Sequence, residues 1–355
     1  MIVSVIIKTL NEERRIGRTI ETALAAIASV DGEIIVADSG SSDRTIEIAT
    51  GYPVRIVQIM PPAEPSCGIG PQLGYQYAKG SYICLIDGDM ELDETFLGEG
   101  LDFLAKNPKV AGVTGHVEEQ MLDSLEYTRR VTRNAPEART GSIDRMNGGG
   151  LYRRAAIERV GYFTDRNLHC HEEFDLGVRL RSKGWLLHRL DRRFVSHYGH
   201  SINSYRLLVR RWRTKYLFGI GELLRASAGQ PYWKNVLADL PELKLWALVA
   251  CWMLASLAVL VMVPAKAIAV SDVLVLAAAV VTAMSIRKRS FTMGLYTVVA
   301  WLFHTTAVPF GYLRPRRDPR QWIESRELGG QDAENAPAGL DGDGNRWTGV
   351  CQRVG

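Results

Sequence analysis

The sequence predicts an α/β protein with a mostly parallel sheet, followed by helices that cross a membrane or lie on it. Two features predict this architecture. Short apolar runs alternate with segments of helical periodicity in the N-terminal part, and three long apolar stretches lie near the C-terminus. Alternating apolar strands and helices are typical of a parallel sheet that is covered on both faces.

The composition is that of a globular protein. Of the 355 residues, 46% are hydrophobic and 23% are charged, and the net charge is +4. These values exclude a fully disordered chain and a collagen-like fibre, and the positive excess is too small to indicate a nucleic-acid partner. The five cysteines form no C-x-x-C pair, which argues against a secreted disulfide framework and fits a reducing compartment.

Strands and helices are predicted in alternation up to the first acidic motif. We expect strands at residues 3–7, 33–37, 54–59 and 82–86, and helices at 13–29, 43–49 and 72–78. The opening run lacks the basic region and the cleavage site of a signal peptide. Parallel sheets bind ligands at the carboxyl ends of their strands. The polar residues that follow the predicted strand ends are Asn11, Glu12, Asp38, Ser39, Asp87 and Asp89.

The three apolar stretches are candidate membrane spans. They cover Leu245–Val263, Ala267–Ile286 and Phe291–Leu313. A bilayer core of about 30 Å needs about 20 apolar residues in a helix, which the first two stretches supply. The third contains His304 and Pro309, and it could instead be an interfacial or re-entrant helix. Two spans and three spans are therefore both possible.

Basic residues set the expected orientation. Arg287–Arg289 follow the second stretch, and the positive-inside rule places them and the N-terminal domain on the cytoplasmic side of the inner membrane. A third span would put Arg314 and the arginines after it outside. We expect an α/β domain at 1–225, an interfacial linker at 226–243, a multi-pass membrane region at 244–313 and a disordered polar tail at 314–355.

The sharpest local signal is the run Asp87-Gly88-Asp89 after an apolar strand. Two carboxylates on one tight turn can face a single hard cation, such as Mg²⁺ or Mn²⁺. A cation held there would neutralise a diphosphate leaving group. The alternative is a solvated turn without a ligand.

The run from Asp38 to Asp43 ends the second predicted strand. Its carboxylate could accept a hydrogen bond from a nucleobase, and its small residues would let a nucleotide approach. The alternative is an ordinary N-capped loop. The glycines at 68, 70 and 74 do not have the spacing of a dinucleotide fingerprint and follow no strand, which excludes a Rossmann dehydrogenase.

A second acidic run, His171-Glu172-Glu173-Phe174-Asp175, opens a predicted helix. Adjacent carboxylates repel each other, so one of them is suited to act as a general base. The alternative is a helix first turn in which acidic residues favour the dipole. His169 and Cys170 lack a second pair of zinc ligands at suitable spacing.

Five motifs in this order resemble the inverting family 2 glycosyltransferases, which have the GT-A fold, a Rossmann-like nucleotide-sugar-binding fold. The resemblance covers roughly residues 1 to 221. The motifs are Val3–Glu12, Ile34–Thr45, Gly74–Asp89, Gly148–Phe163 and Glu172–Trp185.

The resemblance implies a role for each matching residue. The nucleotide-sugar side would comprise Thr9, Asn11, Glu12, Asp38, Ser39 and Asp87. Within it, Asp38 would bind the base and Glu12 the nucleoside. Asp89, with Asp87 and His197, would hold the metal, Mg²⁺ or Mn²⁺. Glu173, flanked by Glu172 and Asp175, would deprotonate the acceptor hydroxyl, which attacks the anomeric carbon with inversion.

Three departures from the family pattern bear on function. Pro71 and Gln72 occupy places where members often carry Arg-Asn. Glu173 replaces the usual Asp, which lengthens the base by one methylene. The signature Q-x-x-R-W of processive members is incomplete, because Leu208 precedes Arg211-Trp212 at the Gln position. The last departure favours transfer of a single sugar.

The basic, aromatic segment before the apolar stretches suits an interfacial helix, in which Arg210, Arg211 and Trp212 would face an acceptor or lipid. Simple membrane anchoring is the alternative. We expect a UDP- or GDP-sugar donor, a lipid-linked or surface-glycan acceptor, a membrane, and no nucleic acid as partners. The rival functions are a polyprenyl-phosphate glycosyltransferase and a non-catalytic membrane scaffold of the same fold.

Overall fold

The computed structural model describes residues 1–120, 139–198 and 203–328, which divide into two compact units. The first, which we call the α/β unit, comprises Met1–Ile202 and Pro315–Gly355. The second, the helical unit, is Asn203–Arg314. The division lies at residue 203, ahead of the expected 225, because the helices after residue 203 pack on the last apolar helix.

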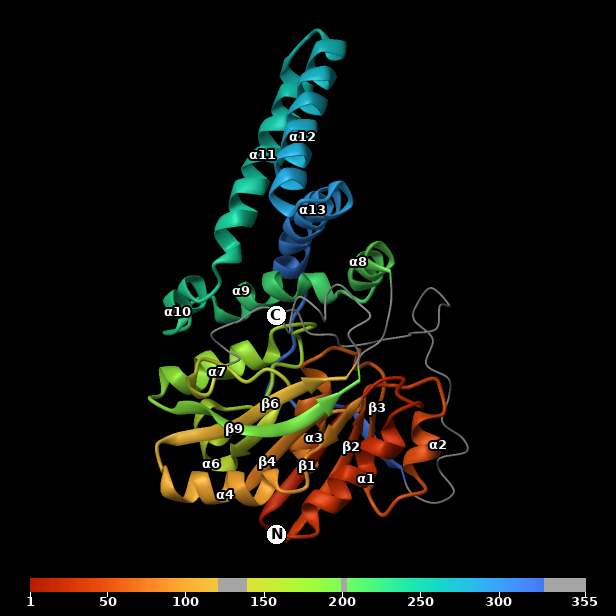
Figure 1. The fold of residues 1–355 in the computed structure, drawn as a ribbon, viewed down its shortest axis with the longest axis vertical. Helices are drawn as coiled ribbons and strands as arrows, with labels where there is room; N and C mark the ends of the chain where they lie inside the picture. The colour runs from red at the N-terminus through yellow and green to blue at the C-terminus, as the bar shows by residue number, and fades with distance from the viewer. Residues whose placement is uncertain (121–138, 199–202, 329–355) are drawn as a thin grey trace. The chain divides into compact units, whose positions relative to one another are not determined.

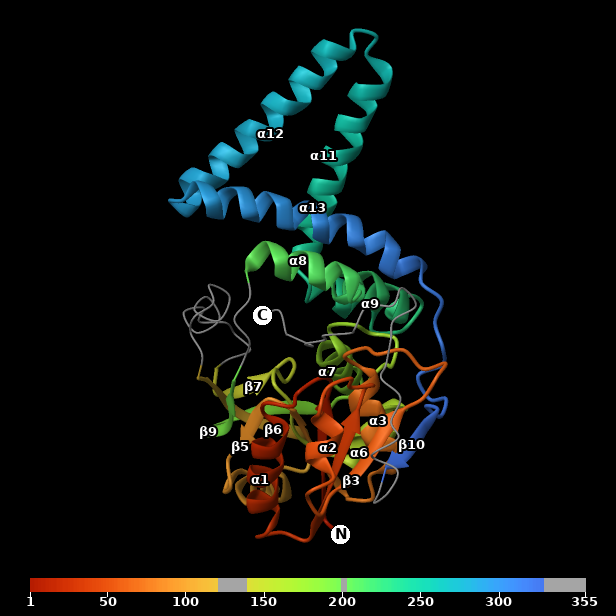
Figure 2. The same ribbon diagram turned by 90° about the vertical axis from the view of Figure 1, so that its right-hand side faces the viewer.

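The α/β unit is built on one mixed sheet (Figures 1 and 2). Its strand order is β10-β3-β2-β1-β4-β8-β6-β9-β5, and β7 pairs with β9. The strands β1 to β4 are mutually parallel, whereas β8 joins β4 in antiparallel register. The bounds are β1 Val3–Thr9, β2 Gly32–Asp38, β3 Arg55–Ile59, β4 Tyr82–Asp87, β5 Met90–Leu92, β6 Val110–Glu119, β7 Gly141–Ile143, β8 Gly150–Arg153, β9 Leu186–His197 and β10 Ser325–Leu328.

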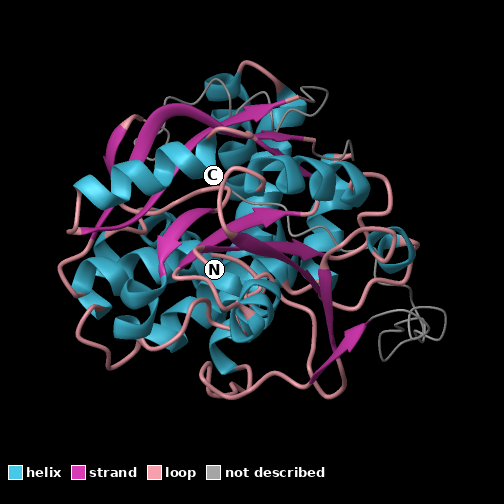
Figure 3. Ribbon diagram, turned by 90° about the horizontal axis from the view of Figure 1, so that it is seen from below, coloured by secondary structure: helices cyan, strands magenta, loops and turns pink. Residues whose placement is uncertain are grey.

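Helices cover both faces of this sheet (Figure 3), as the alternation of strands and helices predicts. The first two helices and the fourth pack on one face, and the third, sixth and seventh pack on the other. Their bounds are α1 Ile16–Ile27, α2 Thr45–Ala49, α3 Ile69–Tyr77, α4 Phe96–Lys106, α6 Arg154–Val160 and α7 Glu172–Ser182.

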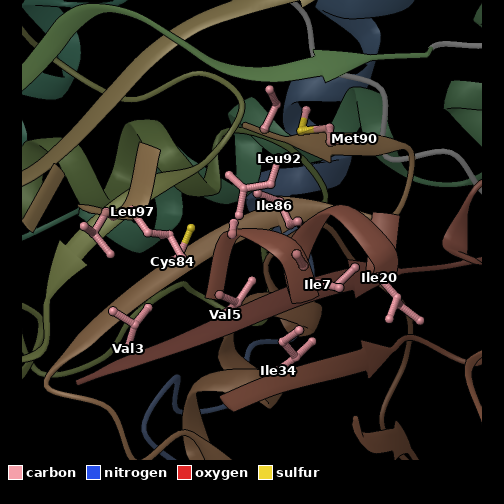
Figure 4. Close-up of a cluster of buried hydrophobic side chains, with 14 of the residues drawn as sticks. Val3, Val5, Ile7, Ile20, Ile34, Cys84, Ile86, Met90, Leu92 and Leu97 are labelled. Carbon is pink, nitrogen blue, oxygen red and sulfur yellow. The ribbon is translucent and has the colours of Figure 1, made fainter. Parts of the chain in front are cut away.

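The alternating direction of side chains along each strand explains how both faces of the sheet are buried. Val5 and Ile7 of β1 pack with Ile20 of α1, as Figure 4 shows for one face. Ile6, between them, packs with Leu73 of α3 on the opposite face. Successive side chains of a strand point to opposite faces, so a strand covered on both sides is mainly apolar at successive positions, and a buried polar residue such as Ser4 is hydrogen-bonded.

The register of the parallel strands brings their polar ends to one edge. Thr9 lies opposite Asp38, and Lys8 lies opposite Asp87. The backbone N–H of Ser39 donates to the carbonyl oxygen of Thr9 at 2.9 Å. The expected clustering of polar residues at the carboxyl ends of β1, β2 and β4 is therefore present.

The C-terminal segment contributes a strand to the α/β unit. The polar tail after residue 314 was expected to be disordered, but Ser325–Leu328 forms β10, antiparallel to β3. The guanidinium of Arg55 on β3 forms a two-point ion pair with Glu327. The edge of β3 offers unpaired backbone groups that β10 satisfies, a non-local partner that composition does not reveal. Residues 329–355 lie outside the described residues.

The helical unit contains the basic segment and the apolar stretches. Its last three helices, α11, α12 and α13, are long and apolar enough to cross a membrane by length and composition. Figure 2 shows α11 and α12 as a hairpin that turns at Val263–Ala265. The bounds are α8 Ser204–Arg213, the 3₁₀ turn η2 Tyr216–Phe218, α9 Gly219–Ser227, α10 Trp233–Ala238, α11 Glu242–Met262, α12 Lys266–Lys288 and α13 Phe291–Leu313.

Three cysteines of the described residues, Cys84, Cys170 and Cys251, are present as thiols. Burial raises the pKa of the Cys84 thiol.

Candidate active site

Asp38 ends β2, and its carboxylate organises the loop that follows. It is fully buried and accepts hydrogen bonds from the backbone N–H groups of Gly40 and Ser41 at 2.9 and 2.8 Å. The Ser41 hydroxyl and the amide of Gln58, at 2.8 Å, are further donors. Burial raises the pKa of Asp38 above its usual range, although these donors lower it. The carboxylate is thus satisfied within the protein, and its contact with a nucleobase stays a prediction.

The loop after β1 is joined to the loop after β2 by hydrogen bonds. Asn11 has a φ of 58°, and its Oδ1 accepts from Ser42 N at 2.7 Å. The backbone N–H of Asn11 donates to the Ser41 hydroxyl at 2.8 Å. The backbone N–H of Glu12 donates to the Thr45 hydroxyl at 2.7 Å. Asn11, Glu12 and Asp38, three of the predicted nucleotide-side residues, therefore lie on one connected pair of loops.

Lys8 joins the two acidic motifs. Its ammonium lies 3.2 Å from Asp87 Oδ1 and 3.1 Å from Glu172 Oε1. The Lys8 side chain is 7% exposed, so one buried ammonium is shared by two carboxylates. The run Asp87–Asp89 and the run that opens α7 therefore meet at one edge of the sheet.

Glu173 is held by the loop before β8. Its Oε1 accepts from Gly149 N at 2.7 Å, and its Oε2 accepts from Gly148 N at 3.3 Å. Gly149 has a φ of +83°, and a Cβ there would lie 1.9 Å from the carbonyl oxygen of Leu85, so only glycine fits. Gly148 and Gly149, the first residues of the fourth motif, thus fix the position of the predicted base.

Asp175 lies away from these contacts, in a structural ion pair. Its Oδ2 accepts from Arg179 Nε at 2.7 Å, and both side chains are almost fully buried. Burial raises the pKa of Asp175, which Arg179 opposes. The guanidinium also donates to the carbonyl oxygens of Tyr162 and Phe163. This pair anchors α7 and leaves Glu172 and Glu173 facing the site.

Asp89, His197 and Glu119 form a buried row. His197 Nε2 lies 3.2 Å from Asp89 Oδ2, and His197 Nδ1 lies 2.6 Å from Glu119 Oε2. Burial lowers the pKa of His197, but hydrogen bonds to the two carboxylates outweigh it and raise the pKa to about 9. The structure therefore pairs the predicted metal residues Asp89 and His197, whereas Asp87 faces Lys8.

This pair fits a divalent cation that is shared with a substrate. No group of three or more His, Cys, Asp or Glu side chains in the described part of the chain is arranged to hold a metal ion by itself. Mg²⁺ is commonly bound through one or two protein carboxylates together with substrate phosphates, rather than in a cage of protein ligands alone. The buried oxygen of Asp89 beside the Nε2 of His197 supplies two donors of suitable chemistry.

Two residues of the site were not found by sequence reasoning. Lys8 could have been singled out, because a charged residue near the end of a mainly apolar, buried strand needs a buried partner. Nothing in the sequence distinguishes Glu119, because it is one of several polar residues in a row at the end of β6. Its partner His197 lies 78 residues further along the chain.

The three predicted acceptor-side residues lie on α8 of the helical unit. Trp212 packs edge to face against Phe218 and Phe303. Arg211 is buried, and its guanidinium lies 5.2 Å from the centre of the Tyr216 ring. Arg210 is partly exposed. The aromatic packing of α8 explains its position beside α13, and the acceptor role stays a prediction.

The mixed sheet with acidic residues at its strand ends is a GT-A fold. A solved mannosyltransferase from Pyrobaculum calidifontis, in complex with GDP-Man and Mn²⁺, has a similar fold, with a TM-score of 0.54 and 18% identity, covering 88% of this chain and 86% of that one. Residues 4–161 match the model of Glycosyl transferase family 2. Residues 4–161 of this chain are therefore similar to glycosyl transferase family 2.

Characterised relatives are similar over part of their length. Glucomannan 4-beta-mannosyltransferase 7 of Arabidopsis thaliana is 30% identical over 168 residues, covering 44% of this chain and 29% of the relative. Poly-beta-1,6-N-acetyl-D-glucosamine synthase of Staphylococcus epidermidis is 23% identical over 200 residues, covering 53% and 46%. The matched region thus spans less than half of either relative.

Proposed function

We propose that this protein is a membrane-anchored glycosyltransferase that moves one sugar from a UDP- or GDP-sugar to a lipid-linked or surface-glycan acceptor, with inversion. The observation that carries the proposal is the meeting of the two acidic motifs at Lys8, which contacts both Asp87 and Glu172. It supports one site in which a donor and a general base lie close together. The names of the relatives, which are mannosyltransferases and a polysaccharide synthase, agree with this class of reaction.

Glu173 is the proposed base. Two backbone N–H groups hold its carboxylate, so its position does not depend on the substrate. It takes the proton of the acceptor hydroxyl as the oxygen attacks the anomeric carbon. The nucleoside diphosphate leaves from the opposite face of that carbon, which inverts its configuration.

Asp89 and His197 are the proposed holders of Mg²⁺ or Mn²⁺. The cation would supply positive charge that neutralises the diphosphate as it leaves. Asp87, which Lys8 holds in place, is proposed to contact the ribose or nucleoside. The loop pair of Asn11 and Asp38, with the buried residues Thr9, Glu12 and Ser39, forms the proposed nucleotide side.

We propose that the chain crosses the membrane twice. The N-terminal 202 residues and β10 belong to one folded unit, so both ends of the helical unit lie on the same side of the membrane. An even number of crossings must therefore connect them. The mean hydropathies of 2.4 for α11 and 2.3 for α12, against 1.3 for α13, favour the first two helices as the spans. The positive-inside rule keeps the catalytic domain in the cytoplasm.

The contacts of α13 support an interfacial position. It packs closely on η2 and α9, because a Cβ at Gly311 would lie 2.1 Å from the carbonyl oxygen of Phe218. The Arg225 guanidinium of α9 donates to the carbonyl oxygen of Tyr312 at 3.0 Å. Helix α13 also contacts α8, which is basic and amphipathic, and a helix that packs on such a surface is suited to the headgroup region.

Cysteine labelling tests this topology. In intact cells, a membrane-impermeant maleimide should label Ala265→Cys, in the turn of the hairpin. Asp318→Cys should react only after permeabilisation, and the unsubstituted protein serves as the control. Labelling of Asp318→Cys from outside would contradict two crossings.

A donor screen tests the reaction. Detergent-purified full-length protein is supplied with UDP- and GDP-sugars and Mg²⁺ or Mn²⁺, and release of the nucleoside diphosphate is measured. We expect release with one class of donor, and its loss in Asp89→Asn. Unchanged cellular activity in Asp89→Asn would favour a non-catalytic scaffold. Near-normal turnover in Glu173→Gln would favour a polyprenyl-phosphate acceptor, because a phosphate needs less help from a base.

A further inference from the structure

We propose that Glu119 is a positioning residue, which holds the imidazole of His197 with Nε2 toward Asp89 and so completes a two-ligand site for a divalent cation. This inference rests on the metal-dependent transfer proposed above. In this proposal Glu119 acts by orienting His197, and Glu119 itself does not contact the substrate.

Strand register builds this arrangement. Glu119 on β6 lies opposite His197 on β9 in parallel register. On the other side of β9, Met90 of β5 lies opposite His197, and the backbone N–H of Tyr198 donates to the carbonyl oxygen of Asp89 at 3.1 Å. Three neighbouring strands therefore bring the two carboxylates to the two nitrogens of one ring. The sheet sets this geometry before any ligand binds.

The two ring nitrogens have different partners. Nδ1 lies 2.6 Å from Glu119 Oε2, the shorter of the two contacts, and Nε2 lies 3.2 Å from Asp89 Oδ2. An imidazole that donates its Nδ1–H to a carboxylate presents Nε2 as the free donor atom for a metal. A carboxylate behind a metal-binding histidine fixes the ring orientation and its tautomer in this way.

Glu119 and its neighbour Glu118 differ in how far their side chains are buried. The Glu119 side chain is 3% exposed, whereas the Glu118 side chain is 55% exposed and lies 3.5 Å from the exposed guanidinium of Arg193. A buried carboxylate is stable only when it is paired, and His197 is one charged partner of Glu119. Glu118 therefore provides a matched control on the same strand.

The test measures Mn²⁺ binding to the full-length protein in detergent. Free Mn²⁺ is quantified by electron paramagnetic resonance in the presence of UDP or GDP, and spin-echo modulation detects a coordinated nitrogen. We compare Glu119→Ala, Glu119→Gln, Glu118→Gln and His197→Gln with the wild type. Thermal unfolding of each variant establishes that it is folded.

We expect Glu119→Ala to weaken Mn²⁺ binding by about 10- to 100-fold and to diminish the nitrogen modulation. Saturating Mn²⁺ should restore most of its turnover. Glu119→Gln, which keeps an oxygen acceptor for Nδ1–H, should lose less, and Glu118→Gln should match the wild type.

Three results would overturn the inference, and they refute different parts of it. Wild-type Mn²⁺ affinity and nitrogen modulation in a folded Glu119→Ala protein would refute the positioning role alone. A wild-type protein that binds no Mn²⁺ with either nucleotide would refute both this role and the metal-dependent function. If Glu119→Ala does not fold, the Glu119→Gln and Glu118→Gln pair decides, since equal affinities in the two would also refute the role.

Discussion

The ammonium of Lys8 lies 3.1 Å from Glu172, a residue 164 positions further along the chain. This contact joins the end of the first strand to the start of α7. The same ammonium lies 3.2 Å from Asp87, so one buried cation links both acidic motifs. The electrostatic balance of the site therefore depends on a lysine that neither motif contains.

Replacing Lys8 by methionine should destabilise the fold and abolish most turnover. Loss of the cation leaves Asp87 and Glu172 buried without their shared counter-charge, which costs on the order of 3–5 kcal/mol when one partner of a buried pair is removed. Chemical unfolding in detergent measures this change. Adding Glu172→Gln to Lys8→Met should recover part of the loss. Equal stability of Lys8→Met and the exposed-site control Lys106→Met would contradict the expectation.

Glu173→Gln should lower turnover by about 10²–10⁴-fold, because a glutamine amide cannot accept the proton of the acceptor hydroxyl. Donor affinity should change little. Steady-state assays of product release at varied donor concentration separate turnover from donor affinity. The control is Glu158→Gln on α6, outside the site. A reduced donor affinity with normal turnover would assign Glu173 to donor binding instead.

The stability of the metal-free protein should fall between pH 6.5 and about 9 through His197. The folded-state pKa of about 9 lies above the ordinary value of 6.5. The protonated form is therefore favoured by folding, its contribution is fully present below pH 6.5, and it is lost as the pH rises through 9. A shift of that size corresponds to about 3 kcal/mol.

Thermal unfolding as a function of pH measures this effect. His197→Gln should flatten the decline above pH 6.5. His188→Gln is the control, because burial lowers the pKa of His188 and its titration affects stability only at lower pH. A decline in His197→Gln as steep as in the wild type would assign the pH dependence to other groups.

Arg326→Ala should raise the KM for the donor severalfold with kcat nearly unchanged. On β10, the Arg326 guanidinium donates to Gln58 Oε1 at 2.8 Å, and the amide nitrogen of Gln58 donates to Asp38 at 2.8 Å. The arginine thus fixes the direction of the amide that holds Asp38, at the centre of the proposed nucleotide loop. Steady-state kinetics with varied donor provides the measurement.

Glu327→Gln is the matched variant for this experiment. It weakens the exposed Arg55–Glu327 pair on the same two strands and leaves Gln58 untouched. Exposed pairs contribute about 0–1 kcal/mol, so its kinetics should resemble the wild type. If both variants raised the donor KM equally, attachment of β10 rather than orientation of Gln58 would be the cause.

Much of the fold was predictable because its signals are local. Runs such as Val3–Ile7, which is apolar except for Ser4, and Tyr82–Ile86 predict strands buried on both faces, and both are strands of the observed sheet. The loop residues after those strands share an edge because parallel strands end together. Structure in the C-terminal tail was harder to predict, since the polar segment Ser325–Leu328 becomes a strand only beside the open edge of β3.

The α/β class, the position of the acidic residues at strand ends and the three apolar helices could be predicted from local patterns, because apolar periodicity is encoded among neighbours in the chain. The partner of each charge became known only from the folded arrangement. Asp87 pairs with Lys8, Asp175 pairs with Arg179, and His197 stands between Asp89 and Glu119. Which buried charges compensate one another depends on strand order and register, and these bring together residues that are remote in sequence.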